Sequence, residues 1–146
     1  MNETRPDQPQ PTVLYQDRHL LVISKPAGLL AQGDKTGDTA AATWGAAFLS
    51  AQRREAGKEG GNPFIAPAHR LDRPVSGTLI LACTSKAAKR LHRLFLEKTI
   101  HKSYLAIVEG PLESPTRVRL WLSKNRQTNK VLVRSTATPG FKEAIT

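Results

Sequence analysis

The segment HRLDRPVSGTLILAC, residues 69–83, carries the strongest fold signal and the strongest candidate site of this chain. Its second part, Thr78–Cys83, is a continuous apolar run, which is typical of a buried β-strand. Its first part places one acid, Asp72, between two arginines, Arg70 and Arg73. Loops that are held by a rigid strand often carry functional groups. The segment therefore predicts a polar, reactive loop that is positioned by a core strand.

Two strands and a helix are predicted ahead of this segment. Residues 12–16 (TVLYQ) and 20–24 (LLVIS) are short and rich in β-branched and apolar side chains, as strands are. The helix is expected to begin near Asp38 or Thr39, because either side chain could cap it. Its predicted apolar face repeats at helical spacing and consists of Trp44, Ala47, Phe48 and Ala51.

A second helix is predicted after the apolar run, capped by Thr84 or Ser85 and ending near Ile100. Its apolar stripe consists of Ala87, Leu91, Leu94 and Phe95. A separate basic stripe consists of Lys86, Lys89, Arg90 and Arg93. Such a stripe could follow phosphate groups, although a charged helix face is most often simply solvated.

Three strands are expected in the remaining chain, at residues 103–109 (SYLAIVE), 118–122 and 131–134. The last two should form a hairpin through a turn at residues 125–129. Strands and helices do not alternate regularly, so the pattern predicts a mixed α+β fold with a mainly antiparallel sheet and flanking helices.

Length and composition predict one domain, residues 12–146, behind a disordered tail of residues 1–11. The tail is polar and lacks the apolar region of a secretory signal, and no run approaches the ~20 apolar residues of a membrane span. The single cysteine, Cys83, excludes an intrachain disulfide and a cysteine-rich zinc site. We therefore expect a cytoplasmic monomer without a metal.

The net charge of +10 is distributed unevenly along the chain. Residues 1–66 hold seven basic and seven acidic residues, whereas residues 67–146 hold fifteen basic and five acidic ones. Such asymmetry predicts a polyanionic partner, and both nucleic acid and an anionic membrane fit the charge alone.

The local chemistry of Asp72 allows two interpretations. Neighbouring cations favour an ionised carboxylate that could act as a nucleophile or a base. Acids beside arginines are also common as surface ion pairs, so these residues alone leave both interpretations open. A glycoside hydrolase would need two carboxylates around a sugar, and only Asp72 has such a setting.

HRLDRPVSG (69–77) resembles the active-site loop of RluA-type pseudouridine synthases. Three further segments resemble motifs of the same family in the same order: LLVISKPAGL (20–29), KSYLAIVEG (102–110) and KEAIT (142–146). The resemblance extends over residues 12–146. It implies the pseudouridine synthase catalytic fold, with RNA, ribosomal or transfer, as the partner.

The reaction that the resemblance implies isomerises uridine to pseudouridine. The bond from C1′ to N1 is broken, the base rotates, and C1′ is joined to C5, so the reaction requires no cofactor. Asp72 matches the catalytic aspartate of the family. The residues expected to contact or position the RNA are Arg70, Tyr104, His69, Arg73, Ser76 and Gly77.

Individual roles follow from the same resemblance. Arg70 would enter the place in the RNA that the flipped uridine vacates, and Tyr104 would stack against the flipped base. A salt bridge or a phosphate contact is the alternative for Arg70, and a core position is the alternative for Tyr104. His69 would orient the loop, while Ser76 and Gly77 would shape its turn.

The resemblance ends earlier than the family's catalytic domain does. That domain continues into an Arg-Thr-His-Gln-like motif whose basic residue pairs with the catalytic aspartate, and no such motif follows residue 110 here. The sequence thus predicts an incomplete catalytic fold, apparently truncated at its C-terminus. Two hypotheses follow: an RNA-modifying enzyme, or a catalytically inactive RNA-binding module.

Overall fold

The computed structural model describes residues 9–33, 38–58, 60–111, 117–125, 127–128 and 130–145. Most of the predicted N-terminal tail, residues 1–8, lies outside this description. The chain divides into two compact units, residues 1–102 and 103–146, which are described separately.

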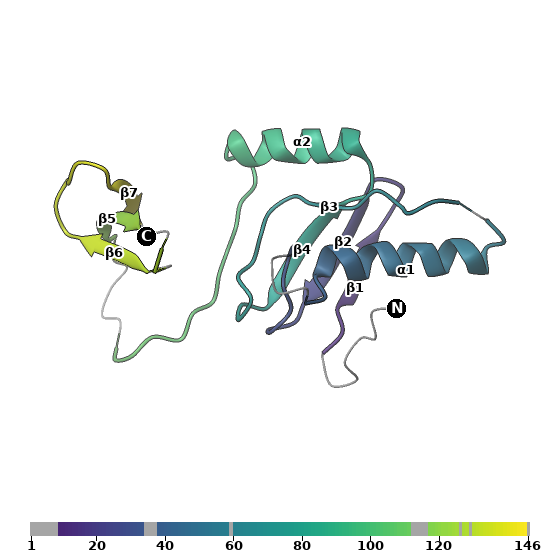
Figure 1. Cartoon of the computed structure of the whole chain (residues 1–146), viewed down its shortest axis with the longest axis horizontal. Coiled ribbons are helices and arrows are strands. Elements are labelled where there is room, and N and C mark those ends of the chain that lie inside the picture. Colours follow the sequence, from purple (N-terminus) through teal and green to yellow (C-terminus); the bar gives the residue numbers. More distant parts are fainter. Residues whose placement is uncertain are drawn as a thin grey trace. The chain divides into compact units, whose positions relative to one another are not determined.

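The first unit is a four-stranded antiparallel sheet with two helices (Figure 1). Its elements are β1 (Thr12–Gln16), β2 (Leu20–Lys25), α1 (Ala41–Glu55), β3 (Ala66–Pro67), β4 (Gly77–Ala82) and α2 (Ser85–Leu96). The strand order is β1-β2-β4-β3, so the predicted core strand β4 lies inside the sheet. The short strand β3 was not predicted. The antiparallel sheet with its helices confirms the expected α+β class.

The core lies where β2 pairs with β4. Leu21 faces Leu81 and Ile23 faces Leu79, and all four side chains are fully buried. They share one face because side chains alternate along a strand. Burial of each such side chain contributes about 1.5–3 kcal/mol to folding. This pair of strands therefore forms the rigid support of the loop that precedes β4.

Helix α1 packs closely on this core through a glycine. A Cβ atom at Gly45 would lie 3.0 Å from Leu81 Cδ1 and 3.3 Å from Leu21 Cδ2, so only glycine allows this approach without a shift of the leucines. Trp44 and Phe48 stack at 5.2 Å beside the core, as the predicted apolar face requires. The prediction was wrong for Ala47, which is exposed.

The start of α1 differs from the prediction. The helix begins at Ala41, its N-cap is Ala40, and no side chain caps it. The carbonyl oxygen of Leu30 instead accepts a hydrogen bond from the Ala41 N–H at 2.7 Å. The predicted cap Asp38 forms an ion pair elsewhere. A tertiary backbone contact thus replaces the side-chain cap.

Helix α2 begins as predicted and ends earlier than predicted. Thr84 Oγ1 accepts a hydrogen bond from the Ala87 N–H at 3.2 Å, which confirms the threonine cap. The helix ends at Leu96 because Lys98 adopts a left-handed conformation, with φ of 54°. The Lys98 and Thr99 N–H groups donate to the carbonyls of Phe95 and Leu94. This pattern is a Schellman motif, which closes the helix.

The second unit contains a three-stranded antiparallel sheet in the order β6-β5-β7. Its strands are β5 (Arg119–Lys124), β6 (Val131–Arg134) and β7 (Lys142–Ile145). The predicted hairpin between β5 and β6 is confirmed. Asn125 forms its turn, because Oδ1 accepts from the Gln127 and Thr128 N–H groups at 2.9 and 3.1 Å.

The strand predicted at residues 103–109 is wrong. This segment has no regular secondary structure, and its side chains are exposed, with Leu105 and Ile107 fully so. Figure 1 draws it as a loop without an arrow. An alternating apolar pattern forms a strand only when another strand accepts its backbone hydrogen bonds, and no described strand does so here.

Within the described ranges, no helix combines the length and the apolar character that a bilayer-spanning helix needs.

Candidate active site

The loop at residues 68–76 joins β3 to β4 and is tied to β4 by His69. The Ala68 N–H donates to the Ile80 carbonyl at 2.9 Å. The Ile80 N–H donates in turn to His69 Nε2 at 3.3 Å. The imidazole thus takes the place of the next backbone acceptor in the β3–β4 ladder. It also packs against Phe95, with the ring centres 5.1 Å apart.

The electrostatic setting of His69 suits this acceptor role. Burial lowers the pKa of His69 below its ordinary value of 6.5, and the positive charge of Lys102 lowers it further. A hydrogen bond with the Arg70 backbone opposes both effects. A neutral imidazole can accept at Nε2, whereas the imidazolium has no free acceptor. The geometry supports the predicted role of His69 in orienting the loop.

The middle of the loop exposes Asp72 at a turn. Its carbonyl oxygen accepts from the Val75 N–H at 3.0 Å, while the preceding Leu71 is buried and anchors the chain. The Asp72 side chain is exposed. Its carboxylate has no hydrogen-bond or ion-pair partner among the residues that the structure describes. The turn ends at Gly77, whose φ of 138° is one that residues with a side chain rarely adopt.

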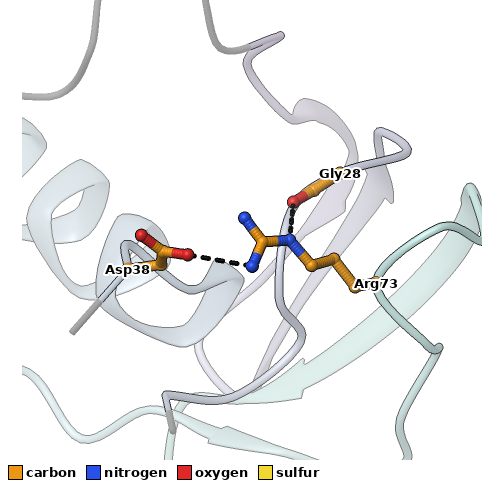
Figure 2. Close-up of polar contacts among 3 residues, drawn as sticks. All are labelled: Gly28, Asp38 and Arg73. Carbon is orange, nitrogen blue, oxygen red and sulfur yellow. Dashed lines mark hydrogen bonds and ion pairs between the residues drawn. The ribbon is translucent and has the colours of Figure 1, made fainter. Parts of the chain in front are cut away.

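Arg73 connects this loop to two other segments (Figure 2). Its Nε donates to the Gly28 carbonyl at 3.0 Å. Its Nη1 forms an ion pair with Asp38 Oδ2 at 2.9 Å. The Gly28 N–H donates back to the Arg73 carbonyl at 2.8 Å. The guanidinium is thus engaged within the protein, and contact of Arg73 with RNA stays a prediction.

Lys25 is a site residue that sequence reasoning missed. It is completely buried, and its Nζ donates to the carbonyls of Leu29 at 2.7 Å, Pro26 at 3.0 Å and Arg73 at 3.5 Å. Burial lowers the pKa of Lys25, and the negative charge of Asp72 acts in the opposite direction. Lys25 is therefore a buried cation within electrostatic range of the candidate catalytic carboxylate.

A signal for Lys25 was present in the sequence. Side chains alternate along a strand, so Lys25 falls on the same face as Leu21 and Ile23, which are buried. A lysine at an inward position needs polar partners, because an unpaired buried charge is costly. The segment that follows, residues 26–29, supplies two of those partners as the carbonyl oxygens of Pro26 and Leu29.

The other predicted site residues differ in their settings. Arg70 and Ser76 are exposed on the same loop as Asp72. The Arg70 side chain makes no hydrogen bond or ion pair with any described residue, which leaves it available to a ligand. Tyr104 belongs to the second unit, where its side chain is 63% exposed. The described residues contain no group of three potential metal ligands.

Comparison with known proteins gives consistent matches. The family described as RNA pseudouridylate synthase matches residues 19–146. Dual-specificity RNA pseudouridine synthase RluA of Haemophilus influenzae is 38% identical over 109 residues, which are 75% of this chain and 45% of that protein. Ribosomal large subunit pseudouridine synthase C of Escherichia coli K12 is 37% identical over 119 residues, which are 77% and 33% of the two chains.

A transfer RNA enzyme and two solved structures show the same likeness. The tRNA pseudouridine synthase C of Pasteurella multocida is 34% identical, over 74% of this chain and 43% of that protein. Human RNA Pseudouridylate Synthase Domain Containing 4 and 1 share the fold, with TM-scores of 0.60 and 0.62 at 18% identity. The matches cover 91% and 97% of this chain and 51% and 53% of those chains. The chain thus spans half or less of the length of the curated relatives it matches.

Proposed function

The chain belongs to the RNA pseudouridylate synthase family, and from this premise we propose that it isomerises uridine to pseudouridine in structured RNA, with Asp72 as the catalytic carboxylate. The observation that carries the proposal is the exposed Asp72 side chain on a turn whose flanking residues are anchored. The relatives include proteins named as enzymes of ribosomal RNA and of transfer RNA. The proposed substrate is therefore a uridine in rRNA or tRNA, and the proposed location is the cytoplasm.

Three contacts hold the loop that carries Asp72 and thereby restrict the position of its carboxylate. His69 ties the loop to β4 on one side of Asp72. Arg73 ties it to Gly28 and Asp38 on the other side. Reacting groups must be held within about half an ångström of their productive positions to work well. A loop with anchors on both sides of the carboxylate meets this requirement better than a free surface turn.

The chemical role of Asp72 follows from its exposure and from the reaction. The target uridine must leave its stack to reach a protein carboxylate, at a cost of a few kcal/mol. An exposed aspartate on a projecting turn is accessible to a flipped nucleotide. The buried Lys25 lies within electrostatic range of Asp72. Attack on the sugar, addition to the base and removal of a sugar proton would each need an ionised carboxylate.

Arg70 and Tyr104 complete the proposal. Arg70 lies two residues before Asp72, and its exposed guanidinium makes no hydrogen bond or ion pair with a described residue. It could therefore occupy the space that the flipped base leaves. Tyr104 offers an exposed aromatic face for base stacking. Both roles rest on the family resemblance together with the exposure of these side chains.

A mapping experiment tests the proposal. The protein is incubated with unmodified rRNA and tRNA, and new pseudouridines are mapped for the wild type and for Asp72→Asn. We expect pseudouridine at a defined uridine with the wild type only. Equal formation by the two proteins would remove Asp72 from the chemistry.

A second function is favoured by one observation. The Asp72 carboxylate has no hydrogen-bond partner among the described residues, and catalytic carboxylates are usually oriented by such partners. The chain could therefore be an RNA-binding module without catalytic activity. Under that alternative, RNA binding persists and no pseudouridine forms with either protein.

A further inference from the structure

An open cavity of about 440 Å³ lies at the end of the sheet remote from Asp72. The loop that carries Asp72 joins β4 at its first residue, Gly77, whereas Cys83, which lines the cavity, follows the last residue of β4. At ~3.3 Å per residue, the length of β4 separates Gly77, where the loop of Asp72 ends, from Cys83 by roughly 20 Å. The cavity is therefore distinct from the candidate active site, and we call it the β4-end cavity.

Three cations from three different segments line the β4-end cavity. Arg18 lies in the turn between β1 and β2, Arg53 lies in the last turn of α1, and Lys58 follows that helix. None of the three forms an ion pair with a described acid. Three of the other six lining residues are polar as well, namely Gln16, Asp17 and Gln52. Six of the nine lining residues are therefore polar or charged, which is unlike the mainly apolar lining of small-molecule sites. The arrangement favours an anion as the ligand.

The one acid in the lining does not neutralise these cations directly. Asp17 Oδ1 accepts from the His19 and Leu20 N–H groups, each at 2.7 Å, and its Oδ2 accepts from the Tyr15 hydroxyl at 3.0 Å. These hydrogen bonds lower the pKa of Asp17, and the bond from the His19 N–H has the largest effect. They also fix the turn that carries Arg18, so the backbone of this cation is already ordered.

The cations are also not needed as hydrogen-bond donors to the last carbonyl groups of α1. The carbonyls of Gln52, Arg53 and Arg54 accept hydrogen bonds from the N–H groups of residues 56–58. The helix end is thus capped by its own backbone. Its residual dipole amounts to about half a negative charge, which is smaller than the net positive charge of the lining.

The wall between β1 and α1 is held by a pair of amides. Gln16 Nε2 donates to Gln52 Oε1 at 2.7 Å, and Gln52 Nε2 donates to Gln16 Oε1 at 3.2 Å. This reciprocal pair joins the sheet edge to the helix from which Arg53 projects. The pair therefore holds in register the two segments that carry Arg18 and Arg53.

We propose that the β4-end cavity binds a backbone phosphate of the RNA substrate, at a distance from the uridine that reaches Asp72. The inference rests on the proposed function, because it assumes RNA as the substrate. Duplex DNA carries one phosphate per strand every ~3.4 Å along its helix axis, and on this scale roughly 20 Å along an RNA stem corresponds to on the order of six base-pair steps. The cavity would thus require a stem of that length beside the target uridine and would select structured RNA over short fragments.

The test compares two neighbouring arginines on the same helix turn. Arg53 lines the cavity and Arg54 does not, so Arg53→Gln and Arg54→Gln remove the same charge at adjacent positions. Affinity is measured over a salt series with the 146-residue chain and two stem–loop RNAs, with stems of about twelve and about three base pairs. Far-UV circular dichroism checks that both variants fold.

We expect Arg53→Gln to weaken binding of the long stem by roughly threefold to tenfold and to reduce the salt slope by about 0.9, as the loss of one phosphate contact does. Arg54→Gln should stay within about twofold of the wild type, and the short stem should not distinguish the two variants. Equal affinities of the two variants for the long stem would overturn the inference. The inference would also be overturned if Arg53→Gln reduced the affinity for the long and the short stem equally, because the contribution of Arg53 would then not depend on stem length.

Two further arms separate the possible failures. Inorganic phosphate at matched ionic strength should displace the long stem no better than chloride does. A displacement that depends on Arg53 would assign the cavity to a free phosphate and overturn the inference. Absence of salt-dependent RNA binding by the wild type would overturn both the inference and the proposed function. If the wild type binds RNA but the two variants bind the long stem with equal affinity, the inference would be overturned while the proposed function would stand.

Discussion

Arg73 and Gly28, 45 residues apart in the chain, exchange hydrogen bonds in both directions. The Arg73 side chain donates to the Gly28 carbonyl at 3.0 Å, and the Gly28 N–H donates to the Arg73 carbonyl at 2.8 Å. The turn after β2 and the loop before β4 are thereby joined next to Asp72. Two of the motifs that carry the family resemblance meet in this bridge.

Replacement of Arg73 should damage the loop more than it damages RNA binding. Arg73→Gln removes the ion pair with Asp38 and the hydrogen bond to Gly28. The arginine side chain is 46% exposed, so we expect the free energy of unfolding to fall by only about 1 kcal/mol. The single-turnover rate should fall roughly tenfold or more, because small displacements of catalytic groups are costly. Urea unfolding and rate measurements check both.

Arg70→Gln is the matched control for this prediction. Arg70 lies on the same loop and is exposed without a described partner, so its loss should change the free energy of unfolding by less than about 0.5 kcal/mol. It should weaken RNA binding instead. Equal destabilisation by the two substitutions would show that the Arg73 contacts do not hold the loop.

Asp72→Asn should abolish isomerisation and leave the fold and RNA binding intact. The amide keeps the shape of the side chain and removes the charge that each possible chemical route needs. Asp72 is exposed, and its carboxylate makes no hydrogen bond or ion pair with a described residue, so the unfolding free energy should change by less than about 0.5 kcal/mol. Single-turnover assays provide the measurement, and activity within tenfold of the wild type would exclude Asp72 as the catalytic group.

Lys25→Met should lower the free energy of unfolding far more than the replacement of an exposed lysine does. The methionine side chain fills a similar space but leaves the carbonyls of Leu29 and Pro26 without their buried donor. An unsatisfied buried polar group costs about 1–3 kcal/mol. The exposed Lys86 provides the control, because Lys86→Met should change stability by less than about 0.5 kcal/mol. Chemical denaturation of both variants would show no difference if the Lys25 contacts were unimportant.

His69 should make the protein less stable in mildly acidic solution. The folded-state pKa of His69 is lowered below 6.5, so below pH 6.5 the unfolded chain binds a proton that the folded chain excludes. Stability is therefore complete above pH 6.5 and falls as the pH decreases between 6.5 and the lowered value. The variant His69→Gln keeps an acceptor for the Ile80 N–H and does not titrate.

Thermal unfolding between pH 7.5 and 5 checks this expectation. The wild type should lose more stability over this interval than His69→Gln does. Parallel curves for the two proteins would show that His69 is not coupled to folding.

The sequence predicted well those elements whose signals are local. The apolar run at residues 78–83 became the buried strand β4, and Thr84 caps α2 through its own hydroxyl. The hairpin between β5 and β6 was also expected, because Asn125 favours a turn through its own side chain. Each of these signals acts over a few residues, so no knowledge of the rest of the fold is needed.

The failures concern features that depend on distant partners. Residues 103–109 alternate like a strand, but no described strand pairs with them. Helix α1 begins where the distant Leu30 carbonyl accepts its first N–H, rather than at a capping side chain. Single-sequence reasoning cannot supply such partners.

The candidate site shows the same division. Its loop and its central carboxylate were predicted from local composition and from the family resemblance. The contacts that hold the loop were not, because Lys25, Gly28 and Asp38 reach it from other segments. Only the alternation that places Lys25 beside buried side chains could have indicated one of them.

The left-handed backbone conformation of Lys98 at the end of α2 indicates a substitution that should increase the stability of the protein. A non-glycine residue in that conformation costs roughly 1 kcal/mol, and glycine adopts it without this cost. Lys98→Gly should therefore raise the melting temperature by several degrees while leaving Asp72 and the β4-end cavity untouched. Because α2 packs against β3 and β4, a better-closed helix end would stabilise the unit that carries the loop, and the variant would be a favourable starting point for crystallisation with RNA.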